Sequence, residues 1–69
     1  MTTISWNING IYCHFPELQL ITTQYQPDFL CIQETHLKQS SKITFKSYKT
    51  YRKDRDDGYG GVATLIHQN

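Results

Sequence analysis

Two short strand-like runs separated by one helical segment constrain the fold of this chain more than any other feature. Residues 3–6 (Thr-Ile-Ser-Trp) and 29–32 (Phe-Leu-Cys-Ile) have strand character. Between them, Pro16 and Glu17 favour the start of a helix and Pro27 favours its end. A strand, a helical crossover and a second strand form a β–α–β unit with parallel strands and a right-handed connection. We therefore expect an α/β fold.

The side-chain pattern predicts which surfaces of these elements are buried. Apolar and polar residues alternate over residues 2–7, which predicts a strand with one polar side. Residues 28–33 hold a continuous apolar run, which predicts a strand buried on both faces. In the helix, the spacing of Leu18, Ile21 and Tyr25 predicts the side that packs on the sheet.

The second half of the chain has the pattern of an antiparallel β-hairpin. After a polar loop over residues 35–41, the β-prone residues 43–53 and 62–66 flank the turn residues 56–58 and 60–61. A mixed sheet of about four strands with one helix leaves one face uncovered, and an apolar sheet face must be buried by another layer. We therefore expect the whole chain to be one truncated domain, a sheet from a larger layered structure.

The size and composition of the chain exclude several classes of protein. A core of 69 residues is marginal unless it belongs to a larger body. No run approaches the roughly 20 apolar residues that span a bilayer, and the N-terminus lacks a secretory pattern. We expect no membrane partner and a nuclear or cytoplasmic location, not secretion, with reduced thiols. A zinc site is the weaker alternative, because paired C-x-x-C spacing is missing. Its ligands would be Cys13, His14, Cys31 and His36.

The basic residues are confined to one stretch of the chain. Residues 1–37 contain no Lys or Arg, whereas residues 38–55 contain all seven of them and one acidic residue, Asp54. A local basic strip of this size is a candidate phosphate footprint, although charge alone also fits an ordinary solvated surface. The candidates for nucleic-acid contact are Lys38, Lys42, Lys46, Arg52 and Lys53.

An amide and a carboxylate follow the two parallel strands. Ligands gather at the carboxyl ends of parallel strands, so we expect Asn7 and Glu34 to approach each other there. Magnesium is often held by one or two carboxylates, waters and substrate phosphate. Glu34 is the candidate ligand for magnesium or manganese, with Asn7 orienting Glu34 or contacting phosphate, and Asn9 contacting a metal-bound water. The alternative is that both asparagines cap a turn and Glu34 is an ordinary surface residue.

Three strings occur in the order Asn7-Ile8-Asn9-Gly10, residues 27–36 (Pro-Asp-Phe-Leu-Cys-Ile-Gln-Glu-Thr-His) and residues 58–63 (Gly-Tyr-Gly-Gly-Val-Ala). Their order and spacing resemble the endonuclease/exonuclease/phosphatase superfamily, and specifically the apurinic-type endonuclease domain of non-LTR retrotransposon polyproteins. The resemblance implies a partial piece of a four-layer α/β sandwich and metal-dependent phosphodiester hydrolysis. It matches Asn7 to a catalytic asparagine and Glu34 to the metal-binding glutamate. The family often has Asp where this chain has Asn9, which weakens direct metal contact by Asn9.

The same resemblance implies that essential groups lie outside this sequence. The family uses a tyrosine, an Asp-x-Asn pair and a terminal Asp-His pair from later segments, and His14, His36 and His67 stand in no matching string. His36 follows Glu34 by two residues, so a position near the site is one interpretation, but we favour an ordinary solvent-exposed loop histidine. The expected protein is an N-terminal fragment of a magnesium-dependent DNA endonuclease, inactive alone, whose partners are DNA and the rest of its domain. The alternative is a non-catalytic α/β module that binds nucleic acid or protein through residues 38–55.

Overall fold

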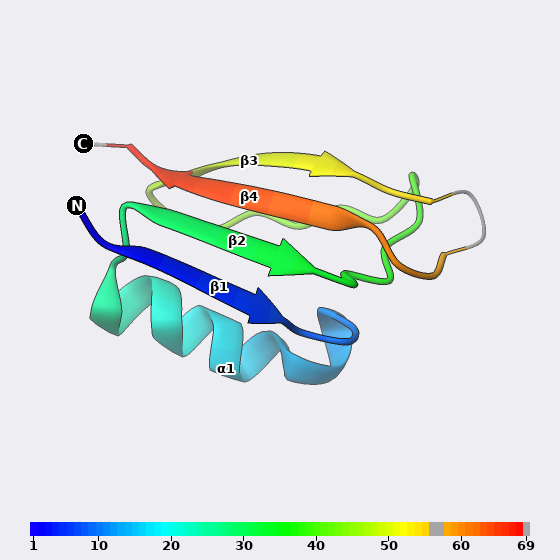
Figure 1. Ribbon diagram of the computed structural model, residues 1–69, viewed down its shortest axis with the longest axis horizontal. Helices are drawn as coiled ribbons and strands as arrows, with labels where there is room; N and C mark the ends of the chain where they lie inside the picture. Colours follow the sequence, from blue (N-terminus) through cyan, green and yellow to red (C-terminus); the bar gives the residue numbers. More distant parts are fainter. Residues whose placement is uncertain (56–57, 69) are drawn as a thin grey trace.

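The computed structural model describes residues 1–55 and 58–68, which form a four-stranded mixed sheet with a helical segment on one face (Figure 1). The strand order is β1-β2-β4-β3, with β1 and β2 parallel and the other neighbours antiparallel. The predicted β–α–β unit and β-hairpin are therefore both confirmed. Asp56 and Asp57 of the predicted tight connection lie outside the described residues. The elements are β1 (Thr3–Asn7), η1 (Tyr12–His14), α1 (Phe15–Leu20), η2 (Ile21–Tyr25), β2 (Phe29–Gln33), β3 (Tyr48–Lys53) and β4 (Val62–His67).

The helical crossover changes its winding partway along. Pro16 lies in the first turn of α1, but η2 is a π-helix that ends with a hydrogen bond from Gln26 N to Ile21 O (3.1 Å). Leu18 is fully buried as predicted, whereas Tyr25 is 70% exposed, so its predicted packing on the sheet is wrong. The wider π-helical turn rotates Tyr25 away from the sheet, and Thr22 is buried instead.

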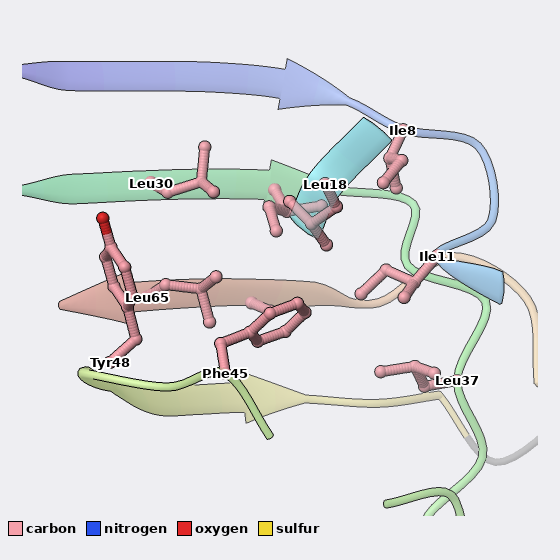
Figure 2. Packing of buried hydrophobic residues seen from close by; sticks show 10 residues of the cluster. Ile8, Ile11, Leu18, Leu30, Leu37, Phe45, Tyr48 and Leu65 are labelled. Atoms are coloured by element: carbon pink, nitrogen blue, oxygen red, sulfur yellow. The ribbon is translucent and has the colours of Figure 1, made fainter. Parts of the chain in front are cut away.

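The covered face of the sheet is the side against which α1 and the loop at residues 34–47 pack. Leu18 from α1 and both Leu37 and Phe45 from the loop belong to the same buried cluster as side chains of β2 and β4 (Figure 2). The loop is therefore less polar than predicted, and strand β3 begins only at Tyr48, five residues later than the pattern at residue 43 indicated. The short helix lies beside β1, so the loop supplies the apolar cover for the β4 and β3 side (Figure 1). The core residues are Ile8, Ile11, Leu18, Leu30, Ile32, Leu37, Phe45, Tyr48, Ala63 and Leu65.

The open face is the opposite side of the sheet, and the described residues place no second layer on it. In β2 the residues Leu30 and Ile32 are buried, but Phe29, Cys31 and Gln33 are only half-buried. The prediction that β2 is buried on both faces is therefore wrong for this chain. An uncovered apolar face is what the sequence predicts for a sheet that belongs to a larger layered domain.

The cysteines and helices of the described residues fit a plain α/β piece. Cys13 is exposed and Cys31 half-buried, and neither forms a disulfide. Within residues 1–55 and 58–68 no three His, Cys, Asp or Glu side chains gather as a metal site, so the zinc alternative finds no support. Strand pairing fixes Cys31 in the middle of β2, while Cys13 lies in η1. None of the helices in this part of the chain has the length and apolar content to cross a membrane.

Candidate functional site

Asn7 and Glu34 meet at the carboxyl ends of β1 and β2. Asn7 is the last residue of β1 and faces the open side of the sheet, and Glu34 directly follows β2. Asn7 Nδ2 donates a hydrogen bond to Glu34 Oε2 at 2.5 Å. The other carboxylate oxygen, Oε1, lies 4.0 Å from His36 Nε2, and the Glu34 side chain is 49% exposed. The parallel crossover thus brings the two residues together as the strand pattern predicts.

The backbone at Glu34 adopts an unusual conformation. Glu34 has φ +54° and His36 has φ +56°, both in the left-handed region that L-residues avoid. Between them, Thr35 is completely buried. The regular strand conformation therefore ends at Gln33, and the Glu34 side chain that follows it reaches Asn7.

Backbone hydrogen bonds hold this segment from both sides. On the β1 side, Gly10 N donates to Glu34 O (2.8 Å) and Ile11 N donates to Thr35 O (2.9 Å). On the β4 side, Thr35 N donates to Gly61 O (3.3 Å) and His36 N donates to Gly60 O (2.8 Å). The residues that bear the candidate site are therefore fixed between two other chain segments, which is the kind of support that strained backbone requires.

The close approach of residue 61 to the buried Thr35 requires glycine at that position. Gly61 has φ +86°, and a Cβ atom there would lie 2.8 Å from Thr35 Oγ1 and 3.3 Å from Lys53 O. The sequence-based interpretation of the Gly60-Gly61 pair as a place of close backbone approach is thus confirmed. The reasoning from sequence missed Thr35, whose hydroxyl lies 3.4 Å from Gly60 O; a buried threonine beside two glycines gives no signal in a single sequence.

Asn9 and His36 occupy less decisive positions. Asn9 is exposed with φ +52°, a conformation that asparagine adopts more readily than most residues, so the turn alone accounts for an asparagine here. His36 is half-buried with a 29% exposed side chain, contrary to the expected exposed histidine. Its ring lies in a T-shaped arrangement with the ring of Tyr59, at a centroid distance of 6.0 Å.

The candidate phosphate contacts do not form one patch. Lys46 lies beside a hollow with Thr22 and His67, at the end of the sheet opposite Asn7. Lys53 instead shares a row with Asn7 across the open face, through the paired residues Gln33 and Val62. Lys53 and Asn7 are separated by three strand spacings, roughly 14 Å. The exposed lysines among the candidates are Lys38, Lys42, Lys46 and Lys53.

Arg52 differs from these lysines because its guanidinium is engaged inside the protein. Its Nη2 donates to the carbonyl oxygens of Lys38 (3.1 Å), Gln39 (3.4 Å) and Ser41, and its Nε lies 3.1 Å from Asp54 Oδ2. Only 19% of the Arg52 side chain is exposed. This geometry gives Arg52 a structural role and leaves the lysines as the candidates for phosphate contact.

The donor set at Glu34 suits a hard divalent cation. Glu34 supplies one carboxylate that is half exposed, and the hydrogen bond from Asn7 occupies Oε2 while leaving Oε1 open toward His36. A single carboxylate together with waters is a common protein contribution to magnesium binding, whereas zinc requires more nitrogen or sulfur ligands. The site formed by Asn7 and Glu34 therefore fits magnesium or manganese better than zinc.

The chain matches the Endonuclease/Exonuclease/phosphatase family over residues 4–69, and it belongs to this family. Among solved structures, the 3'-5' exonuclease NExo from Neisseria meningitidis is similar with a TM-score of 0.79 and 25% identity, over 96% of this chain and 27% of that one. The product-bound form of the same enzyme, described as a 3' phosphatase with a DNA hairpin, gives the same values. The Xenopus laevis APE2 catalytic domain has a TM-score of 0.76 and 33% identity, over 97% and 23% of the two chains.

These comparisons establish the fold as a part of the family fold. The chain spans about a quarter of the length of the similar structures (27% and 23%), and they contain its sheet and helix. No curated protein sequence matches the chain.

Proposed function

We propose that this chain is the N-terminal part of a DNA-processing hydrolase that uses magnesium or manganese, with Glu34 as metal ligand. The observation that carries the proposal is the hydrogen bond from Asn7 Nδ2 to Glu34 Oε2 at the carboxyl ends of parallel strands. Family membership and the similarity to an exonuclease solved with product DNA support it. The order and spacing of the three strings support the finer proposal of an endonuclease from a non-LTR retrotransposon. A nuclear or cytoplasmic location is part of the same proposal.

In this proposal each residue of the Asn7–Glu34 site has its own role. A bound divalent cation would supply positive charge that stabilises negative charge on a phosphoryl oxygen. Glu34 would hold the cation through Oε1, and Asn7 would keep the carboxylate in place by its hydrogen bond to Oε2. Asn7 would alternatively donate a hydrogen bond to a substrate phosphate oxygen. Asn9 would contact a metal-bound water at most.

The isolated chain should lack measurable nuclease activity. The described residues include no group that the family resemblance matches to a water-activating base, and general acid–base help is worth on the order of 10²–10⁴ in rate. Electrostatic stabilisation by further ligands and phosphate clamps is usually the larger contribution. In this proposal those groups come from the remainder of the same domain, which is also the partner expected on the open face.

Metal binding by the chain itself tests the proposal directly. We expect added Mn²⁺ to broaden the NMR signals of Asn7 and Glu34 first, and Glu34→Gln to remove this selective broadening because the amide keeps the shape but loses the charge. Lys46→Ala, a change at the opposite end of the sheet, is the matched control. In this variant the signals of Asn7 and Glu34 should broaden as they do in the parent. Equal broadening in the parent and in Glu34→Gln would exclude Glu34 as the ligand.

A plasmid-nicking assay with magnesium tests the second part of the proposal. We expect no nicking by the chain above the background of a Glu34→Gln preparation. Nicking by the parent that disappears in Glu34→Gln would show that these residues contain a complete reaction centre, and the proposed need for the remainder of the domain would be wrong.

A binding module without catalysis is the second candidate function, and the exposed lysines favour it. Lys53 lies on the open face in register with Asn7, through the paired residues Gln33 and Val62. Duplex DNA that contacts Lys53 could therefore also approach Asn7 and Glu34. If Lys53 touches a phosphate, Lys53→Ala should weaken DNA binding modestly and reduce the salt slope by about one. DNA binding by the chain without any Mn²⁺ response at Glu34 would favour this alternative.

A further inference from the structure

Arg52 connects β3 to the turn at residues 38–41. Its Nη2 faces three carbonyl oxygens of that turn, those of Lys38, Gln39 and Ser41. The turn is also closed internally, because Ser41 N donates to Lys38 O at 2.9 Å and Lys38 N donates to Ser41 Oγ at 3.2 Å. One side chain on a strand thus fixes the position of a complete turn in the preceding loop.

Asp54 pairs with the Nε side of the same guanidinium. Its Oδ2 lies 3.1 Å from Arg52 Nε, and its side chain is only 6% exposed. Its Oδ1 is buried and has no hydrogen-bond partner within the described residues. A buried ion pair with an unsatisfied oxygen is a poor source of stability, because desolvation offsets much of the attraction. The pair is better explained by the geometry that it imposes.

The 38–41 turn lies just after the strained segment of the candidate site. Glu34 and His36 are left-handed, and Thr35 and Leu37, which alternate with them, are fully buried. Left-handed L-residues persist only where the surrounding structure determines their conformation. The hydrogen bonds from Gly10 N to Glu34 O and from His36 N to Gly60 O hold this segment itself, and the turn bound by Arg52 follows it at Lys38.

We propose that Arg52 is a positioning residue for Glu34. Together with Asp54 it anchors the 38–41 turn, and this anchor maintains the left-handed backbone that directs the Glu34 carboxylate to Asn7. Arginine is required because its planar fork donates to the carbonyls through Nη2 and to Asp54 through Nε, whereas lysine offers one point charge. The proposal rests on the proposed function only where it treats Glu34 as a metal ligand.

The Asn7 side-chain amide provides a direct spectroscopic test in the 69-residue chain. Its NMR signals report the hydrogen bond to Glu34 and require no metal. We expect Arg52→Lys and Asp54→Asn to remain folded by circular dichroism while the Asn7 amide signals shift toward those of a free asparagine. In the same variants, the Mn²⁺ concentration that half-broadens the Glu34 signal should rise about tenfold, as for other groups that orient a metal ligand. Lys49→Ala, at an exposed position of the same strand β3, is the control and should change neither readout.

Each outcome decides the proposal. Folded Arg52→Lys and Asp54→Asn variants with parent-like Asn7 signals would overturn it, because the pair would then hold only its own loop. Unfolding of both variants under conditions where Lys49→Ala stays folded would also overturn it, since the pair would then stabilise the whole fold. If Mn²⁺ fails to broaden Glu34 in the parent chain, the proposed metal site is wrong, but the shift of the Asn7 amide still decides the positioning role.

Discussion

The two faces of the sheet differ although they are made by alternate residues of the same strands. On the covered face Leu30 is completely buried, in the cluster that also contains Leu18 of α1 and Phe45 of the loop (Figure 2). On the open face its neighbour Cys31 is half-buried, and Val62 is 52% exposed. The covered face therefore supplies the core of this chain, while the open face keeps apolar side chains that no described layer buries. Asn7 belongs to the open face, so the candidate site stands on the side that does least for folding.

This difference explains how the site tolerates unfavourable features. Asn7, Glu34 and Lys53 lie on or beside the open face, where polar groups stay in contact with water and desolvation costs little. The left-handed backbone at Glu34 is compensated by contacts of its neighbours Thr35 and Leu37 with the interior. The strained backbone of Glu34, whose carboxylate is exposed, is thus stabilised by the residues that alternate with it and pack on the covered side.

The largest expected effect is on the covered face. Leu30→Ala should lower the free energy of unfolding by about 2–5 kcal/mol, because it removes buried apolar atoms and leaves a cavity. A chain of this length is expected to have a total stability of only about 3–10 kcal/mol, so a large part of the population should unfold. Urea titration followed by circular dichroism measures the change.

Cys31→Ala, at the next position and on the opposite face, is the matched control for Leu30→Ala. Because Cys31 is half-buried and has no cover within the described residues, its truncation should cost less than about 1 kcal/mol. Equal losses at Leu30 and Cys31 would show that the two faces contribute equally, and the distinction between them would have to be abandoned.

A smaller effect is expected at Tyr48, on the rim of the covered face. Its hydroxyl donates to Pro27 O at 2.7 Å, so Tyr48→Phe leaves that carbonyl without this partner and should cost about 1–2 kcal/mol. Burial, and secondarily the charge of Asp28, raise the pKa of Tyr48 above its ordinary value of 10.0. The folded protein therefore holds this proton more tightly than the unfolded chain does.

The raised pKa of Tyr48 makes its contribution dependent on pH. The stabilisation is fully present below pH 10 and is lost as the pH rises from 10 through the higher pKa of the folded state. The urea midpoint of the parent should fall in this range, and the midpoint of Tyr48→Phe should fall less. Parallel pH profiles of the two proteins would show that Tyr48 does not titrate as the structure indicates.

The sequence predicted the parts of the molecule that depend on local pattern and chain direction. Alternation in β1, the proline-bounded crossover and the parallel placement of Asn7 and Glu34 follow from periodicity and from the geometry of a β–α–β unit. The π-helical turn that exposes Tyr25 could not be predicted, because it depends on how α1 fits the sheet. The engagement of Arg52 was also hidden, since its charge indicates phosphate contact until the carbonyls of the 38–41 turn are placed around it.

The smallest expected effect, at Val62, tests what the open face is for. Val62 lies in the same row as Asn7 and is 52% exposed, and Val62→Thr keeps the β-branched shape while replacing a methyl group with a hydroxyl. In this chain the change should alter the free energy of unfolding by no more than about 0.5 kcal/mol, because water can bind the hydroxyl. If the remainder of a family domain covers this face in a longer protein, the same hydroxyl is buried there and should cost about 1–3 kcal/mol. Denaturant titration of both forms measures the difference. An equally small effect in the longer protein would mean that Val62 stays in contact with water there. The open face would then not be the surface on which the second layer packs.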